Sequence, residues 1–122
     1  MSDFNTAGTN GEAVLLDSEE RQQAIANARR VVKDLGKEDY PIVAGITGES
    51  TNQSIKFAHE AARAGANFAL LLPASYWKAS MTDDALLGFY KDVADNSPLP
   101  IVIYNCEPFR CHFNVAMDVT KT

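Results

Sequence analysis

The sequence has few cysteines, no long apolar run and no excess of positive charge. Its two cysteines, Cys106 and Cys111, are too few for a disulfide framework, so we expect a reducing compartment. No apolar run approaches the roughly 20 residues that a membrane-spanning helix needs. The 16 acidic residues outnumber the 11 basic ones and give a net charge of −5. This balance argues against a nucleic-acid-binding protein.

Patterns for metal, nucleotide and signal-peptide functions are also missing. Cys106, Cys111 and His112 are close in sequence, but zinc usually takes four ligands. The only other histidine, His59, falls inside a predicted helix, so we expect no metal. Residues 45–48 lack the lysine and the spacing of a P-loop. The N-terminus has no basic region followed by an apolar core, so we expect a cytoplasmic protein.

What the sequence does contain is an alternation of helical and strand-like segments. Asp17 followed by Glu20 is a capping-box pattern, and glycines mark the ends of two helical patterns. Apolar residues spaced three and four apart indicate helices, and short apolar runs indicate buried strands. The predicted helices run from Asp17 to Gly36, from Ser50 to Gly65 and from Thr82 to Val93, and the predicted strands are 42–44, 68–72 and 101–103.

This order predicts one α/β unit with parallel strands. The spacing between strands is roughly 25 to 35 residues, the size of a βαβ unit, and such crossovers give parallel sheets. Residues 1–7 are polar and show no strand pattern, so we expect a short N-terminal stub. Three strands would leave two open edges, which natural folds seldom expose. We therefore expect either strands from another chain or a segment of a larger fold.

Two features are the best candidates for a functional site. A glycine-rich turn, Gly8-Thr9-Asn10-Gly11, precedes the first helix, and Tyr104 follows the third predicted strand. In parallel α/β proteins the chemistry is carried by residues at the carboxyl ends of strands, so we expect these groups at consecutive strand ends. Taken alone, each also fits a structural role, as an ordinary turn or as a packed aromatic residue.

Four segments together resemble a known family. GTNGEAVLLDSEER, PIVAGITGEST, GANFALLLPASYW and SPLPIVIYN occur here in the order and spacing of the dihydrodipicolinate synthase / N-acetylneuraminate lyase family. The resemblance runs from Gly8 to about Pro108. Within the family, the asparagine of GTNGE, the GEST turn and the MTDDALLGFYKDVADNSPLP stretch are most similar to 4-hydroxy-2-oxoglutarate aldolase and fungal 2-keto-3-deoxy sugar-acid aldolases.

The resemblance implies a (β/α)₈ TIM barrel, of which this chain would hold about three βα units. It implies a lyase that works on 2-oxo acids through a lysine Schiff base, with pyruvate as a product and neither metal nor organic cofactor. A homotetramer is the implied assembly, and a mitochondrial location is the alternative to the cytoplasm. The expected divisions are the stub 1–7, a partial barrel 8–108 and a divergent tail 109–122.

The resemblance also assigns roles to four residues. Thr9 and Asn10 align with the loop that binds the substrate carboxylate, which suits backbone N–H groups freed by the flanking glycines. Tyr104 aligns with the tyrosine that shuttles a proton. Tyr76 aligns with the tyrosine that reaches into a neighbouring subunit's site.

Two departures from the family pattern qualify this picture. The family's Schiff-base lysine lies on a strand beyond the tyrosine strand, and residues 106–112 replace its proline-glycine loop. We therefore expect an internal fragment of a barrel that is inactive alone. The alternatives are a non-catalytic domain that binds a 2-oxo acid or pairs its open sheet edges with a longer relative, and an enzyme that carries out a dihydrodipicolinate synthase-type condensation.

Overall fold

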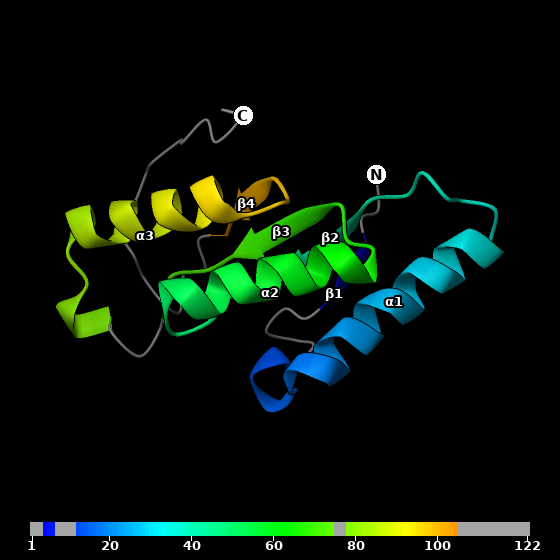
Figure 1. Cartoon of the computed structure of the whole chain (residues 1–122), viewed down its shortest axis with the longest axis horizontal. Helices are drawn as coiled ribbons and strands as arrows, with labels where there is room; N and C mark the ends of the chain where they lie inside the picture. Colours follow the sequence, from blue (N-terminus) through cyan, green and yellow to red (C-terminus); the bar gives the residue numbers. More distant parts are fainter. Residues whose placement is uncertain (1–3, 7–11, 75–77, 105–122) are drawn as a thin grey trace.

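The computed structural model describes residues 4–6, 12–74 and 78–104, which form one sheet covered by helices (Figure 1). Strands and helices alternate along the chain, as the sequence predicts. The elements are β1 (Phe4–Thr6), the short 3₁₀ helix η2 (Ala13–Leu15), α1 (Ser18–Asp34), β2 (Ile42–Gly45), α2 (Thr51–Ala64), β3 (Phe68–Leu71), the short 3₁₀ helix η3 (Lys78–Ser80), α3 (Asp83–Asn96) and β4 (Ile101–Ile103).

The sheet is parallel throughout, with the strands in the order β1-β2-β3-β4. Gly45 of β2 lies opposite Leu70 of β3, and Leu70 lies opposite Val102 of β4. Each of β1, β2 and β3 is followed by a long helix that leads to the next strand. The described chain is therefore three βα units and a fourth strand, which confirms the predicted partial α/β architecture.

The strand at Phe4–Thr6 corrects the prediction that residues 1–7 contain none. It pairs in parallel with β2, and Thr6 lies opposite Ala44. Three residues are too few to show a period of two, so the sequence alone gives no signal there. The strand forms because the edge of β2 supplies partners for its backbone N–H and C=O groups.

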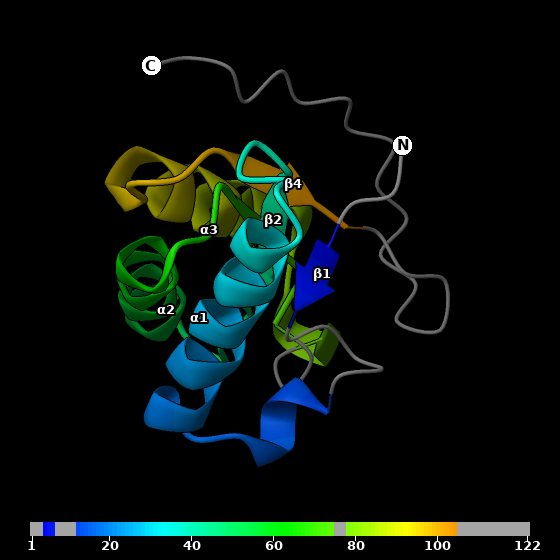
Figure 2. The same ribbon diagram turned by 90° about the vertical axis from the view of Figure 1, so that its right-hand side faces the viewer.

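Helices α1, α2 and α3 lie side by side on one face of the sheet (Figure 2). Alternate strand residues point toward them, and Ile42, Ala44 and Leu71 are fully buried there. Alanines on the sheet-facing side of α2, Ala58 and Ala61, let this helix approach closely. The core therefore lies between the helices and the sheet.

The opposite face of the sheet is partly open in the described residues. Side chains on this face include Phe68, which is 37% exposed, and Val102, which is 40% exposed. Leu70 between them is buried. Apolar side chains therefore reach solvent on the face that the described helices leave uncovered.

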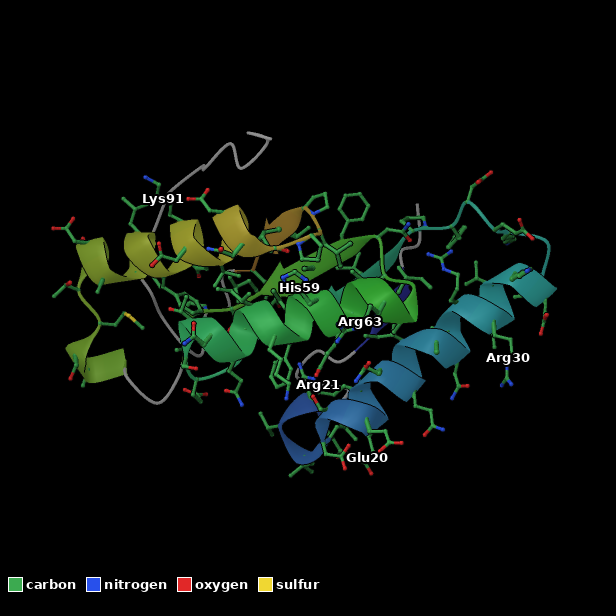
Figure 3. The ribbon with its side chains drawn as sticks, in the orientation of Figure 1. Glu20, Arg21, Arg30, His59, Arg63 and Lys91 are labelled. Atoms are coloured by element: carbon green, nitrogen blue, oxygen red, sulfur yellow. The ribbon has the colours of Figure 1, made fainter. Side chains whose placement is uncertain are left out.

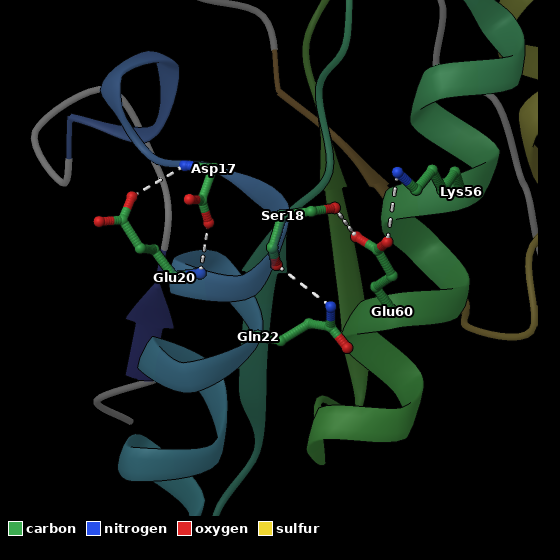
Figure 4. A network of polar contacts seen from close by, with 6 residues as sticks. All are labelled: Asp17, Ser18, Glu20, Gln22, Lys56 and Glu60. Carbon is green, nitrogen blue, oxygen red and sulfur yellow. Dashed lines mark hydrogen bonds and ion pairs between the residues drawn. The ribbon is translucent and has the colours of Figure 1, made fainter.

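The helix ends follow the local signals in the sequence. Asp17 Oδ1 accepts a hydrogen bond from Glu20 N at 2.8 Å, and Glu20 Oε2 accepts one from Asp17 N at 2.9 Å, so the predicted capping box is present (Figure 4). Ser50 and Thr82 cap α2 and α3 through their hydroxyl oxygens. Gly65 ends α2 with a φ of 110°.

Among the described helices, none combines the length and apolarity that crossing a membrane requires.

We expect Gly65→Ala to destabilise the fold by about 1–3 kcal/mol, because a φ of 110° strains any residue with a Cβ. The added Cβ would also lie 3.1 Å from Arg29 Cγ. Gly88→Ala is the matched control, since Gly88 lies within α3 and a Cβ there meets nothing within 4 Å. That control should stabilise by about 0.5–1 kcal/mol. Urea unfolding of both variants measures the difference, and equal effects would contradict this account.

Candidate active site at the carboxyl ends of the strands

The carboxyl ends of the four described strands lie at one edge of the sheet because all strands run in the same direction. The last strand residues are Thr6, Gly45, Leu71 and Ile103. In parallel α/β proteins, this edge carries the residues that follow the strands and bind ligands. Side chains just beyond these four residues are therefore the candidates.

Tyr104 lies at this edge, as the sequence predicts. Its backbone N–H donates to the Leu71 carbonyl at 3.0 Å, which continues the pairing of β4 with β3 by one residue. Tyr104 comes two residues after Val102, so it shares the face that the helices leave uncovered. Its side chain is 47% exposed. The phenol is thus held at the strand end by the backbone and remains accessible to a ligand.

Thr47 is a second polar group at this edge, which the sequence analysis did not single out. Its Oγ1 accepts a hydrogen bond from the Leu72 backbone N–H at 2.9 Å. This contact joins the segment after β2 to the segment after β3, just beyond the last strand residues. The signal in the sequence was a hydroxyl residue two positions after a predicted strand, and such residues are common enough to be overlooked.

The remaining predicted site residues, Thr9, Asn10 and Tyr76, lie outside the described residues. The chain around the first two is described, because Thr6 ends β1 and Glu12 precedes η2. The expectation of consecutive strand ends is wrong. The segment with Thr9 follows β1 and Tyr104 follows β4, with β2 and β3 between them. Strand β1 does place the segment with Thr9 after a strand, as expected, but the strands predicted at 42–44 and 68–72 separate it from Tyr104.

Arg21 is a buried charged residue close to the same edge, and the sequence analysis missed it. Its side chain extends from the start of α1 toward the β2 end and is 6% exposed (Figure 3). Nη2 donates to the Gly45 carbonyl at 2.8 Å, and Nη1 donates to the Ala13 carbonyl at 3.1 Å. The signal was present in the sequence: Arg21 continues the buried stripe of α1 formed by Ile25, Ala28 and Val32.

The charge of Arg21 is compensated by its neighbours. Burial lowers the pKa of the guanidinium, and the negative charge of Glu60 partly opposes that shift. The guanidinium carbon also lies 4.1 Å from the centre of the Phe57 ring, a cation–π contact. An arginine side chain stays protonated in proteins, so the site holds a permanent positive charge.

Glu60 belongs to a polar network that joins α1 and α2 (Figure 4). Its carboxylate accepts a hydrogen bond from Ser18 Oγ at 2.6 Å and lies 3.7 Å from Lys56 Nζ. Glu60 is 6% exposed, so a hydrogen bond and a cation satisfy a buried negative charge.

Within the part of the chain that the structure describes, no three His, Cys, Asp or Glu residues gather into a metal site.

Comparison with known proteins now places the chain. The sequence profile of the dihydrodipicolinate synthetase family matches residues 3–122. This match extends beyond both ends of the predicted partial barrel 8–108, and the division into a barrel part and a divergent tail stays a prediction. The match covers nearly the whole chain, so it does not depend on one motif.

Fungal aldolases are among the similar proteins. A protein of Coccidioides immitis, provisionally named a mitochondrial 4-hydroxy-2-oxoglutarate aldolase, is 46% identical over 98 residues. That alignment covers 80% of this chain and 30% of the relative. The L-threo-3-deoxy-hexylosonate aldolase of Aspergillus niger is 38% identical, with the same shares covered. This chain thus spans about a third of the length of these relatives.

Solved structures agree with the sequence matches. The dihydrodipicolinate synthase of Acinetobacter baumannii, solved with pyruvate, superimposes with a TM-score of 0.79 at 33% identity. This superposition covers 88% of this chain and 35% of that protein. A family protein from Coccidioides immitis gives a TM-score of 0.76 at 40% identity, over 88% of this chain and 33% of the other. The chain belongs to the dihydrodipicolinate synthetase family, and its four parallel strands are part of that family's TIM barrel.

Proposed function

We propose that this chain supplies the carboxylate-binding loop and the strand-end tyrosine of a lyase that cleaves 2-oxo acids and releases pyruvate. The observation that carries the proposal is Tyr104, half exposed at the carboxyl end of β4 in a chain of this family. The names of four relatives support an aldolase, and two solved relatives hold pyruvate.

In the proposed reaction, Thr9 and Asn10 bind the carboxylate of the 2-oxo acid. A lysine amine attacks the ketone carbon and water leaves, which gives an iminium. Tyr104 takes the proton of the 4-hydroxyl group as its own phenolic proton passes to water, the carbon–carbon bond breaks to give an enamine, and the second fragment leaves as an aldehyde. Protonation of the enamine carbon and hydrolysis of the resulting iminium then release pyruvate and the free lysine amine. We place this lysine on a later strand of the barrel than β4. Tyr76 acts across a subunit boundary in this proposal.

The preferred substrate class is a 4-hydroxy-2-oxo acid such as 4-hydroxy-2-oxoglutarate. Support comes from relatives that carry this name, at 46% and 41% identity. Their names also include a mitochondrial location, which we propose beside the cytoplasmic one. The dihydrodipicolinate synthase-type condensation is the second candidate, since two relatives named 4-hydroxy-tetrahydrodipicolinate synthase are 35% identical over slightly longer alignments.

Assembly is a further part of the proposal. A homotetramer is the assembly that the family resemblance implies, although one solved relative is described as a monomeric variant. In the chain described here, β1 and β4 each pair with one neighbouring strand, and apolar side chains reach solvent on the uncovered face. We therefore propose that two copies of this chain associate through these strand edges and this face.

The role of Tyr104 is tested in a hybrid barrel. This chain replaces the aligned segment of the Aspergillus niger aldolase, and pyruvate release from a 3-deoxy-2-oxo sugar acid and from 4-hydroxy-2-oxoglutarate is followed. We expect activity in the hybrid and a loss in kcat on the order of 100-fold or more for Tyr104→Phe, because the proton acceptor is gone. Tyr40→Phe, the same change before β2 at the opposite edge, should retain activity. Normal turnover by the Tyr104 variant would contradict the assignment.

Borohydride trapping tests whether the Schiff-base lysine lies within this chain. The 122-residue chain is mixed with pyruvate and borohydride, and its mass is compared with that of a Schiff-base aldolase treated identically. We expect no covalent adduct on this chain, because the proposed lysine lies on a later strand. An adduct would mean that a reactive lysine lies within these residues, and the fragment interpretation would then be wrong.

Association is tested by sedimentation velocity over a range of concentrations. We expect concentration-dependent dimers, because β1 and β4 are the outer strands of the described sheet and exposed apolar side chains favour pairing with another copy. Val102→Lys on the uncovered sheet face should weaken the dimer by placing like charges against each other. Leu87→Lys on α3, where the leucine is 42% exposed, is the matched control and should leave the dimer intact. A monomer with a cooperative thermal transition at all concentrations would count against self-association.

A further inference from the structure

Arg21 connects three separate pieces of the chain at the carboxyl end of β2. It extends from the first turn of α1, donates to the carbonyl of Ala13, the first residue of η2, and donates to the carbonyl of Gly45, the last residue of β2. The ring of Phe57 from α2 lies against its guanidinium. A single side chain thereby fixes the start of α1, η2 and the end of β2 relative to one another.

Burying the charge of the Arg21 guanidinium costs free energy. If packing were the only role of this position, an apolar residue would therefore suit it better. Burial lowers the pKa of Arg21, and replacing buried ion pairs with apolar residues is often neutral or stabilising. The neighbouring positions on the same stripe, Ile25 and Ala28, are apolar. A buried guanidinium with two backbone carbonyls as acceptors is therefore suited to fixing geometry.

Both flanks of one short segment are held against adjacent residues of β2, the near flank by strand pairing and the far flank by Arg21. Thr6, on the near side of residues 7–11, pairs with Ala44. Ala13, on the far side, is joined through Arg21 to Gly45. The segment between these flanks carries Thr9 and Asn10, the proposed carboxylate-binding residues.

We propose that Arg21 is a positioning residue for the 2-oxo-acid site, acting through the Ala13 and Gly45 carbonyls on the segment that carries Thr9 and Asn10. This inference rests on the proposed function. Arg21 does not touch the substrate in this proposal. Its planar fork bridges two acceptors, which the single ammonium group of a lysine does not reproduce.

Arg29 provides an internal comparison on the same helix. It lies about two turns further along α1 and also donates to backbone carbonyls, at 3.0 Å to Glu38 and 2.9 Å to Gly65. It donates as well to the Tyr40 carbonyl at 3.2 Å. Tyr40 and Gly65 precede β2 and β3, so these acceptors belong to the amino ends of the strands. In barrels of this type, that end contributes stability and the opposite end carries the chemistry.

The test compares Arg21→Lys with Arg29→Lys in the isotopically labelled chain. Pyruvate binding is followed by NMR titration, amide hydrogen exchange is measured at residues 12–16, and Tm is measured for each variant. We expect Arg21→Lys to raise the Kd for pyruvate about tenfold, as loss of one charge-assisted hydrogen bond would, and to speed exchange at residues 12–16. Arg29→Lys should lower Tm and leave both other readings unchanged.

The outcomes separate this inference from the function on which it rests. If Arg21→Lys lowers Tm but leaves the Kd and the local exchange as in the original chain, Arg21 has only a structural role and the inference is overturned. If the original chain binds no pyruvate, the proposed function fails for this chain, and the exchange at residues 12–16 still decides whether Arg21 fixes this segment. If Arg21→Lys does not fold, Phe57→Leu takes its place, with a smaller change expected in the same direction.

Discussion

The parallel pairing of four strands is the constraint on which the rest of this structure depends. It brings the ends of β1 to β4 to one edge, although these ends are far apart in the sequence. It also requires a helix between successive strands, which places α1, α2 and α3 on one face. Tyr104, Thr47 and the carbonyl of Gly45 lie at the same ends of the strands only because this register holds.

Helix α1 contacts the chain at both the carboxyl ends and the amino ends of the strands. At one end Arg21 joins η2 to β2, and further along Arg29 joins the segments before β2 and β3. Both arginines donate to backbone carbonyls, and the carbonyl of Ala13 also accepts from the Leu16 backbone N–H. Hydrogen bonds from an arginine to backbone carbonyls therefore occur at both ends of the strands. Only the strand end distinguishes the positioning role proposed for Arg21 from the stabilising role of Arg29.

Membership in the dihydrodipicolinate synthetase family explains why one sheet face is apolar and yet partly exposed. In a TIM barrel the inward side chains of eight strands fill the interior in layers. Phe68 and Val102 lie on the corresponding face of these four strands, where the described residues supply only part of such an interior. The exposed apolar area is thus what a barrel segment presents when described by itself.

Local chemistry in the sequence determined the helices and most of the strands. The capping box of Asp17 and Glu20 and the glycine at position 65 act through neighbouring backbone groups, so the sequence predicts them without the fold. The placement of Tyr104 followed from its position after an apolar run. Tertiary structure alone decided that Phe4–Thr6 is a strand and which carbonyls the buried Arg21 contacts. Both depend on β2, which is distant in sequence, because an edge strand needs a partner for its backbone and a buried charge needs acceptors that only the folded chain brings to it.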